Sequence, residues 1–115
     1  MHFRELFNLK TSAKHSEFFS LFSHIVTGCD PELSQSKPHP EIFTLCAARF
    51  PAAPDPSQCL VFEDAPNGVE AGLAAGMQVV MVPDHKVTKE FRLAATQVLD
   101  TLEHFDPQDF GLPPL

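Results

Sequence analysis

Two adjacent carboxylates and one lysine are the residues of this chain whose types could do chemistry. Glu63 and Asp64 follow an apolar run directly and precede a predicted helix. In open α/β sheets, ligands bind at the carboxyl ends of the strands, where these two side chains would lie. Mg²⁺ takes one or two protein carboxylates and completes its shell with water and phosphate oxygens. With Lys37 as a positive charge for a phosphoryl oxygen, the three residues indicate a metal and phosphate site.

Each of these residues also has a purely structural interpretation. Asp64 could cap a helix that begins at Pro66, while Glu63 is merely solvated. Lys37 stands in the polar loop sequence SKPHP, and a Lys-Pro pair in such a loop is typical of a surface turn. Taken alone, the carboxylate pair slightly favours the structural interpretation, and the lysine carries almost no weight.

Other residue types argue against several classes of site. The six histidines show no zinc-ligand spacing, and no phosphate-binding glycine-rich loop or nucleophile elbow occurs. Cys29, Cys46 and Cys59 are widely spaced and odd in number, which predicts reduced thiols that act as small buried apolar groups rather than a disulfide frame.

The composition predicts one small domain over residues 1–115. This length is too short for two domains, and 43% hydrophobic with 20% charged residues is ordinary for a globular protein. The net charge of −7 argues against a nucleic-acid or anionic-membrane partner. No apolar run approaches the about 18 residues of a membrane span. We therefore expect a cytoplasmic protein that contacts neither nucleic acid nor membrane.

The elements that must position the site predict an α/β fold. Apolar runs predict strands at residues 23–27, 59–62, 77–82 and 97–99. Helical spacing and proline or glycine punctuation predict helices at 13–22, 40–50, 66–75 and near 89–95. The strand–helix–strand order over residues 59–82 predicts a βαβ unit with parallel strands.

Side-chain patterns predict which faces of these elements are buried. The unbroken apolar run at 59–62 indicates burial on both faces of its strand. Val69 and Leu73 lie one helical turn apart and are expected in the core. Gly76 is placed to close that helix. In the first helix, an inner face is expected to carry Phe18, Phe19 and Phe22.

The order of these motifs resembles that of the haloacid dehalogenase-like (HAD) hydrolases. Lys37-Pro38 is followed by Pro40 and then, at residues 61–77, by VFEDAPNGVEAGLAAGM. The resemblance covers about residues 8–115 and is strongest to phosphatases that release phosphate from a nucleoside 5'-monophosphate with Mg²⁺. It implies a phosphorylated small molecule as the family's substrate, Lys37 as the residue that neutralises phosphoryl charge, and Glu63 and Asp64 as Mg²⁺ ligands.

The resemblance also implies what this chain lacks. In these enzymes an Asp-x-Asp motif on the first strand supplies the nucleophile and the acid/base, a second motif holds phosphate through Ser or Thr, and a helical cap selects the substrate. By resemblance, none of the three lies within these residues. In the family's sheet order, 5-4-1-2-3, strands 1 and 2 would separate residues 23–27 from 59–62 by roughly 14 Å. The expected fold is thus a partial HAD-like, Rossmann-type parallel sheet without the nucleophile strand, its neighbour and the cap.

The lysine loop differs from the family's common pattern at two positions. Ser36 stands where glycine is common, and Cys29 stands where an acidic residue is frequent. If the loop needs a positive φ at position 36, serine would strain it and displace Lys37.

Two functional hypotheses follow from these observations. The first is a truncated phosphatase that is inactive alone because the Asp-x-Asp nucleophile is absent. The second is a non-catalytic interaction module whose open sheet edge pairs with another protein chain by strand addition. A third alternative is that the chain has no cellular function of its own.

Overall fold

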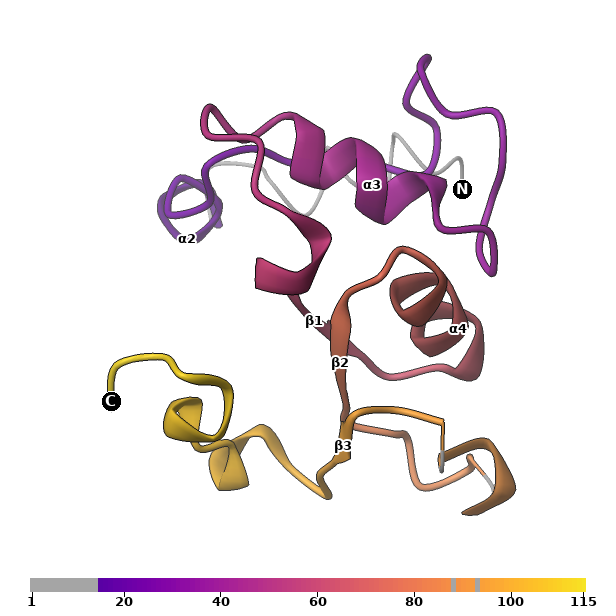
Figure 1. Ribbon diagram of the computed structural model, residues 1–115, viewed down its shortest axis with the longest axis vertical. Helices are drawn as coiled ribbons and strands as arrows, with labels where there is room; N and C mark the ends of the chain where they lie inside the picture. The colour runs from indigo at the N-terminus through magenta and orange to yellow at the C-terminus, as the bar shows by residue number, and fades with distance from the viewer. Residues whose placement is uncertain (1–14, 88, 93) are drawn as a thin grey trace.

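A parallel sheet of three strands, in the order β1-β2-β3, organises the chain. The computed structural model describes residues 15–87, 89–92 and 94–115. The strands are β1 (Leu60–Glu63), β2 (Gln78–Met81) and β3 (Gln97–Val98), and the α-helices are α2 (Ser16–Phe19), α3 (Glu41–Ala48) and α4 (Pro66–Ala74). Short 3₁₀ helices lie at Pro56–Gln58, Lys89–Arg92, Leu102–His104 and Pro107–Phe110. Helix α4 covers one side of the sheet, and the C-terminal 3₁₀ helices lie on the other side (Figure 1). The predicted α/β class is confirmed.

The β1–α4–β2 unit forms as the sequence predicts. Strands β1 and β2 pair in parallel, with Val61 opposite Val79. Strand β2 is central, because β3 pairs in parallel with its other edge. The side chains of Val79, Val80 and Met81 are completely buried. These residues form the centre of the hydrophobic core.

Helix α4 begins and ends where proline and glycine predict. Pro66 occupies the start of the helix, where its fixed φ suits helical backbone and its missing N–H is not needed. Gly76 adopts a φ of +80°, and its amide donates to the carbonyl oxygen of Leu73 at 3.0 Å. The Met77 amide donates to the carbonyl oxygen of Gly72 at 3.1 Å. Together these bonds form a Schellman motif, which confirms the predicted role of Gly76.

Small residues, rather than an apolar stripe, pack α4 onto the sheet. The buried face of the helix carries Gly68, Val69, Ala71 and Gly72. A Cβ atom on Gly72 would lie 2.6 Å from Cγ2 of Val79, so the glycine permits the close approach of helix and strand. Leu73 is exposed. Its predicted core position is therefore wrong, because the small residues beside it face the sheet.

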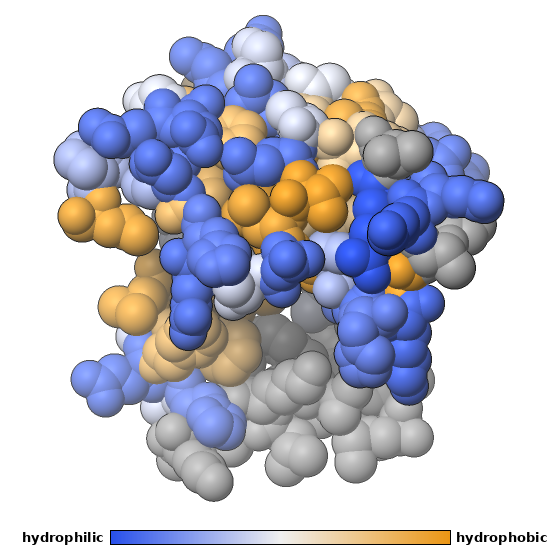
Figure 2. Space-filling view, turned by 90° about the horizontal axis from the view of Figure 1, so that it is seen from below, coloured by the Kyte–Doolittle hydropathy of each residue, from blue (hydrophilic) through white to orange (hydrophobic). Residues whose placement is uncertain are grey.

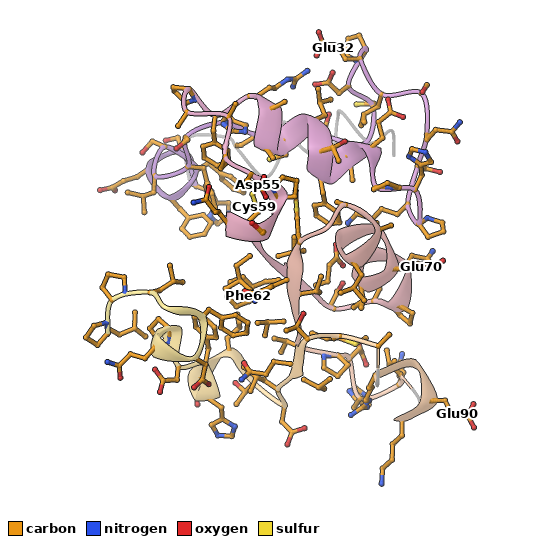
Figure 3. The ribbon with its side chains drawn as sticks, in the orientation of Figure 1. Glu32, Asp55, Cys59, Phe62, Glu70 and Glu90 are labelled. Atoms are coloured by element: carbon orange, nitrogen blue, oxygen red, sulfur yellow. The ribbon has the colours of Figure 1, made fainter. Side chains whose placement is uncertain are left out.

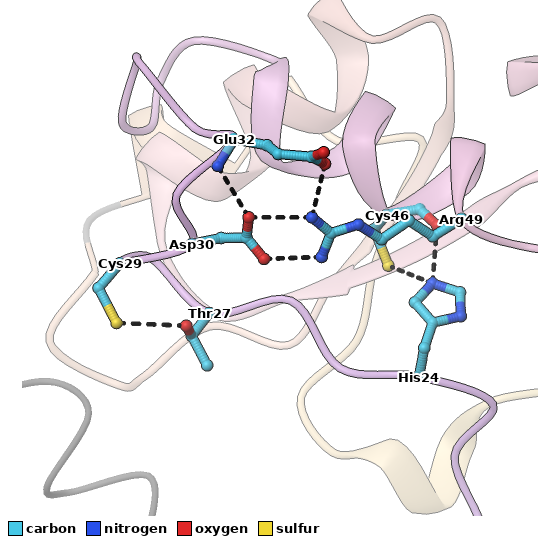
Figure 4. Close-up of polar contacts among 7 residues, drawn as sticks. All are labelled: His24, Thr27, Cys29, Asp30, Glu32, Cys46 and Arg49. Carbon is cyan, nitrogen blue, oxygen red and sulfur yellow. Dashed lines mark hydrogen bonds and ion pairs between the residues drawn. The ribbon is translucent and has the colours of Figure 1, made fainter.

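The predicted strand at residues 23–27 is wrong, because these residues enter no ladder. The segment is attached to α3 instead. Nε2 of His24 lies 2.8 Å from the carbonyl oxygen and 3.4 Å from Sγ of Cys46 (Figure 4). The His24 ring also meets the Phe50 ring edge-on, with 4.4 Å between centroids. A strand forms only when another strand pairs with it, and none of the three described strands pairs with this segment.

The first predicted helix is shorter than residues 13–22. Positions 13 and 14 lie outside the described residues, and α2 ends at Phe19. Phe18 and Phe22 are exposed, so their predicted inner position is wrong. With no sheet face of the described chain beneath them, the rings of Phe18, Phe19 and Phe22 contact one another at centroid distances of 5.3–6.1 Å.

Strand β1 is buried on one face only. Val61 points to the α4 side and is buried. Phe62 is 45% exposed. Its ring is directed toward the C-terminal segment (Figure 3) and meets the Phe105 ring there, with 4.9 Å between the ring centroids. The predicted burial on both faces is therefore wrong, because the C-terminal 3₁₀ segments of the described chain leave the Phe62 side chain exposed.

Apolar side chains remain on the surface of the molecule. Figure 2 shows a group of them, in orange, among hydrophilic residues on one face. The exposed large apolar residues include Phe18, Leu21, Phe22, Ile25, Phe62 and Leu102. Among the described residues, no helix has the length and apolar character that crossing a bilayer requires.

Candidate functional site

The structure brings Lys37, Glu63 and Asp64 together at the carboxyl end of β1. All three line a pocket of about 430 Å³, whose other walls are Phe62, Val82 and Leu102. Glu63 is the last residue of β1, and Asp64 follows it before α4. Lys37 reaches the pocket from the loop that precedes α3. It lies 26 residues before Glu63 in the sequence.

An ion pair fixes the lysine. Nζ of Lys37 donates to Oε1 of Glu63 at 2.5 Å. The same ammonium lies 5.1 Å from the centroid of the Phe43 ring on α3, a cation–π geometry. The Glu63 side chain is only 10% exposed. A carboxylate so far removed from water needs a cationic partner, and Lys37 supplies it.

Gly68 makes room for the Glu63 carboxylate. A Cβ atom at Gly68 would lie 1.9 Å from Cδ and 2.0 Å from Oε2 of Glu63. The carboxylate therefore rests against the first turn of α4, where a larger residue would displace it. Sequence reasoning missed this role of Gly68. Its signal was a glycine inside a helix, which costs about 1 kcal/mol relative to alanine and therefore calls for a packing reason.

Asp64 is exposed at the edge of the pocket and does not cap α4. The N-cap residue is Ala65, and among the described residues no side-chain hydrogen bond caps this end of the helix. The structural interpretation of Asp64 is therefore wrong, and so is that of Glu63 as merely solvated. Within the part of the chain that the structure describes, Asp64 forms no hydrogen bond or ion pair. Its carboxylate is available to a ligand in the pocket.

The lysine loop is free of the strain expected at Ser36. Among the described residues, only Ala53, Gly76 and Gly111 have a positive φ. The Lys37–Pro38 peptide bond is cis.

A second pocket, of about 270 Å³, opens beside Lys37 and is lined by Gly28, Leu33, Gln35, Ser36, Lys37 and Ile42.

The oxygen donors at the pocket suit Mg²⁺ in kind and are few in number. Oε1 of Glu63 is occupied by Lys37, which leaves Asp64 as the carboxylate of the pocket without a partner among the described residues. In residues 15–87, 89–92 and 94–115, no three His, Cys, Asp or Glu side chains are grouped to hold a metal ion. Because Mg²⁺ uses only one or two carboxylates and fills its shell with water and phosphate oxygens, the pair fits part of a magnesium site.

Sequence comparison relates the chain to known phosphatases. The profile of haloacid dehalogenase-like hydrolases matches residues 5–76. A probable pseudouridine-5'-phosphatase of Drosophila melanogaster is 54% identical over 95% of this chain and 47% of its own length. (DL)-glycerol-3-phosphatase 1, mitochondrial, of Arabidopsis thaliana is 49% identical over 93% of this chain and 36% of its own length. The chain thus spans less than half the length of either relative.

Solved structures share the fold. A HAD hydrolase of family IA, variant 3, from Entamoeba histolytica superposes with a TM-score of 0.69 at 20% identity, over 96% of this chain and 48% of that chain. A mutant of CbbY from Rhodobacter sphaeroides, in complex with xylulose-(1,5)bisphosphate, superposes with a TM-score of 0.54 at 27% identity, over 61% of this chain and 30% of that chain. The sequence matches and the shared sheet lead to one conclusion: the chain belongs to the haloacid dehalogenase-like hydrolases.

Proposed function

We propose that this chain carries the lysine and magnesium part of a phosphatase site for a phosphorylated small molecule, and that it releases no phosphate by itself. The observation that carries the proposal is the shared pocket of Lys37, Glu63 and Asp64 at the carboxyl end of β1. Lys37 would neutralise charge on the phosphoryl oxygens, and the two carboxylates would hold Mg²⁺. The ion, when bound, would supply further positive charge to the phosphoryl group.

The ion pair between Lys37 and Glu63 suits such a role. Without a phosphoryl group, the ammonium is neutralised by Glu63 at 2.5 Å. A phosphoryl group that enters the pocket would compete with Glu63 for the ammonium, because both present anionic oxygens. The pocket, at about 430 Å³, falls in the size range of small-molecule sites.

The proposed inactivity follows from the missing nucleophile. Phosphoryl transfer in this family proceeds through an aspartate that attacks the phosphorus atom, and the sequence contains no Asp-x-Asp motif. A lysine and two carboxylates stabilise charge, but they do not replace the attacking group. Release of phosphate would therefore need residues that these 115 do not supply.

The substrate class is proposed from the names of the relatives. Relatives named for pseudouridine 5'-phosphate and for glycerol 3-phosphate match the chain at 54% and 49% identity. Since two substrates correspond to nearly equal similarity, the matched region carries the chemistry that both enzymes share. We infer a phosphorylated small molecule as the ligand, with pseudouridine 5'-phosphate as the first to test.

A phosphate-release assay tests the proposed inactivity. With Mg²⁺ and pseudouridine 5'-phosphate, the chain should release no more phosphate than its Lys37→Ala variant. Release clearly above that variant would contradict the proposal.

A binding experiment tests the pocket itself. Inorganic phosphate with Mg²⁺ should shift the amide NMR signals of Lys37, Glu63 and Asp64 in the unmodified chain. The shifts should vanish in Lys37→Ala and persist in Lys86→Ala, which removes the same charge from an exposed position. Equal shifts in both variants would exclude Lys37 as the phosphate-binding residue.

The outer edge of β1 favours a second candidate function. In the described chain, β1 pairs only with β2. An apolar pocket of about 300 Å³ follows the strand, and its walls are Phe43, Cys46, Ala47, Phe50, Cys59, Leu60, Val61, Phe62 and Met77. A strand of another protein could add to this edge, as the interaction-module hypothesis states. Co-purification of a stoichiometric partner would support it, and a monodisperse, fully folded monomer would count against it.

The cytoplasmic location and the single domain over residues 1–115 stay predictions from composition. Fractionation of cells that produce the tagged chain would test the location. Limited proteolysis would test the domain, since a single domain is expected to resist cleavage between β1 and β3.

A further inference from the structure

We propose that Glu41 and Arg49 are positioning residues that clamp the loop of residues 28–40 to the two ends of α3 and thereby hold Lys37 against Glu63. The inference rests on the function proposed above, because it concerns the placement of its lysine. It goes further, because neither Glu41 nor Arg49 lines the pocket and no sequence motif pointed to either.

Glu41 fastens the part of the loop just before the lysine. It is the first residue of α3. Its Oε1 accepts a hydrogen bond from the Ser34 amide at 2.9 Å, and its Oε2 accepts bonds from the Ser34 hydroxyl at 2.9 Å and the Gln35 amide at 3.0 Å. One carboxylate thus holds two consecutive backbone amides, three and two residues before Lys37. Bonds to an ionised acceptor are about twice as strong as neutral ones.

Arg49 fastens the beginning of the same loop. It follows the last residue of α3. Its Nη1 donates to Oδ2 of Asp30 at 2.6 Å, and its Nη2 donates to Oδ1 of Asp30 at 2.9 Å and to Oε2 of Glu32 at 2.8 Å (Figure 4). The guanidinium fork matches the Asp30 carboxylate with two parallel bonds, a geometry that lysine cannot reproduce. A cation at this end of α3 is also favoured by the helix dipole.

The loop lacks the regular secondary structure and full burial that would fix its position. Between Asp30 and Pro40 the chain forms turns but no helix or strand, and none of its residues is fully buried. Helix α3, by contrast, is anchored in the core through Ala47 and Phe43. The helix therefore acts as a rigid support, and the distance between its two ends fixes where the loop can lie. Phe43, which contacts the Lys37 ammonium, lies between the two clamps.

The experiment compares Glu41→Gln and Arg49→Lys with the unmodified chain, each isotope-labelled for NMR. The readout is the nuclear Overhauser effect (NOE) between the ε-methylene of Lys37 and the γ-methylene of Glu63, recorded together with all amide signals. We expect loss or strong weakening of this NOE in both variants, with shifted amides at residues 28–40 and unchanged amides in β1, α4 and β2. The control for Glu41→Gln is Glu70→Gln, which also removes one negative charge, but from the exposed side of α4. It should leave the NOE intact.

Three outcomes would overturn the inference. An unchanged NOE in Glu41→Gln and Arg49→Lys would show that Lys37 is positioned without the clamps. Loss of the NOE in Glu70→Gln would assign the effect to net charge. Shifts that spread through β1, α4 and β2 would assign to Glu41 and Arg49 a general structural role. The phosphate-binding test is separate: if the variants lose the NOE while the unmodified chain binds no phosphate, the proposed function fails and the positioning role stands.

Discussion

The β1–α4–β2 unit and the preceding residues 15–50 are held together by different interactions. With the exception of Ala47, every buried hydrophobic residue of the described chain lies between Val61 and Met81. Residues 15–50 instead expose large apolar side chains, Phe18, Leu21, Phe22, Ile25 and Phe50, and polar contacts attach the segment before α3 to that helix and to Arg49 at its end. Burial stabilises the first region, whereas a few hydrogen bonds and ion pairs position the second.

This difference matters because the candidate site takes residues from both regions. Glu63 and Asp64 stand on the well-packed unit, while Lys37 comes from the loop that depends on α3. A βαβ unit closes over a short stretch of sequence, so it forms without distant partners. The lysine has no such local support. We therefore expect the geometry of the site to depend mainly on how firmly residues 15–50 hold Lys37 in place.

The largest predicted effect is a difference between the two regions in how much a truncated side chain lowers the free energy of unfolding. Met81→Ala removes a completely buried side chain, which should lower the free energy of unfolding by about 2–5 kcal/mol. Phe22→Ala truncates an exposed ring in the other region and should cost roughly 0.5 kcal/mol, as is usual for surface substitutions. Urea unfolding followed by circular dichroism measures both, and equal losses would contradict the contrast.

The next prediction compares two glycines of α4. Gly72→Ala places a Cβ atom 2.6 Å from Cγ2 of the rigid, buried Val79, so it should destabilise the fold by about 1–3 kcal/mol through overpacking. Gly68→Ala meets only the flexible end of Glu63. Gly68→Ala should therefore lower the free energy of unfolding in urea by less than Gly72→Ala does. It should also displace the Glu63 carboxylate and weaken the NOE between Lys37 and Glu63. If Gly68→Ala keeps this NOE, the proposed fit of Glu63 against α4 is wrong.

A third prediction concerns pH and the Glu41 clamp. Hydrogen bonds from the Ser34 amide, and then from the Ser34 hydroxyl and the Gln35 amide, lower the pKa of the Glu41 carboxyl, and a protonated His39 lowers it further. The clamp is therefore fully present above the pKa of the unfolded chain and is lost as the pH falls through the lower folded-state pKa. The Ser34 and Gln35 amide shifts should titrate with a midpoint below that of glutamate in an unfolded peptide. A midpoint at or above that value would contradict the clamp, and the transition should be absent in Glu41→Gln.

The smallest predicted effect lies in the turn after α3. Ala53 has a φ of 41°, a left-handed conformation that costs an L-residue about 1–2 kcal/mol. Ala53→Gly removes this cost. It also increases the conformational entropy of the unfolded chain, which lowers the free energy of unfolding by roughly 0.4–1 kcal/mol. Because the removed cost is the larger of the two, a slightly higher Tm is expected. Ala52→Gly, at a neighbouring residue without a positive φ, should lower Tm instead. A loss of similar size in both variants would mean that Ala53 is not strained.

Sequence reasoning succeeded where the signals were local. Apolar runs, Pro66 and Gly76 predicted the β1–α4–β2 unit, because each acts on its own few residues. It failed at residues 23–27, because a strand exists only when another strand pairs with it. The inner position of Phe18 and Phe22 failed for the same reason, since that prediction assumed a surface that the described chain does not provide.

The site was predictable in part. The rule that ligands bind at the carboxyl ends of strands pointed to Glu63 and Asp64, and the family resemblance gave weight to Lys37, which alone carried almost none. The contributions of Gly68, Glu41 and Arg49 depend on contacts between segments distant in the sequence. No spacing within one element indicates such contacts, so their roles emerged only from the structure.

One measurement tests most directly whether the two regions meet at this site. It is the NOE spectrum of the unmodified chain at neutral pH, with the cross-strand contacts of β1 and β2 as an internal reference. We predict a cross-peak between the ε-methylene of Lys37 and the γ-methylene of Glu63, because Nζ of Lys37 lies 2.5 Å from Oε1 of Glu63. If the β1–β2 cross-peaks are present and the Lys37–Glu63 cross-peak is absent, the sheet folds without assembling the site, and the central claim is wrong.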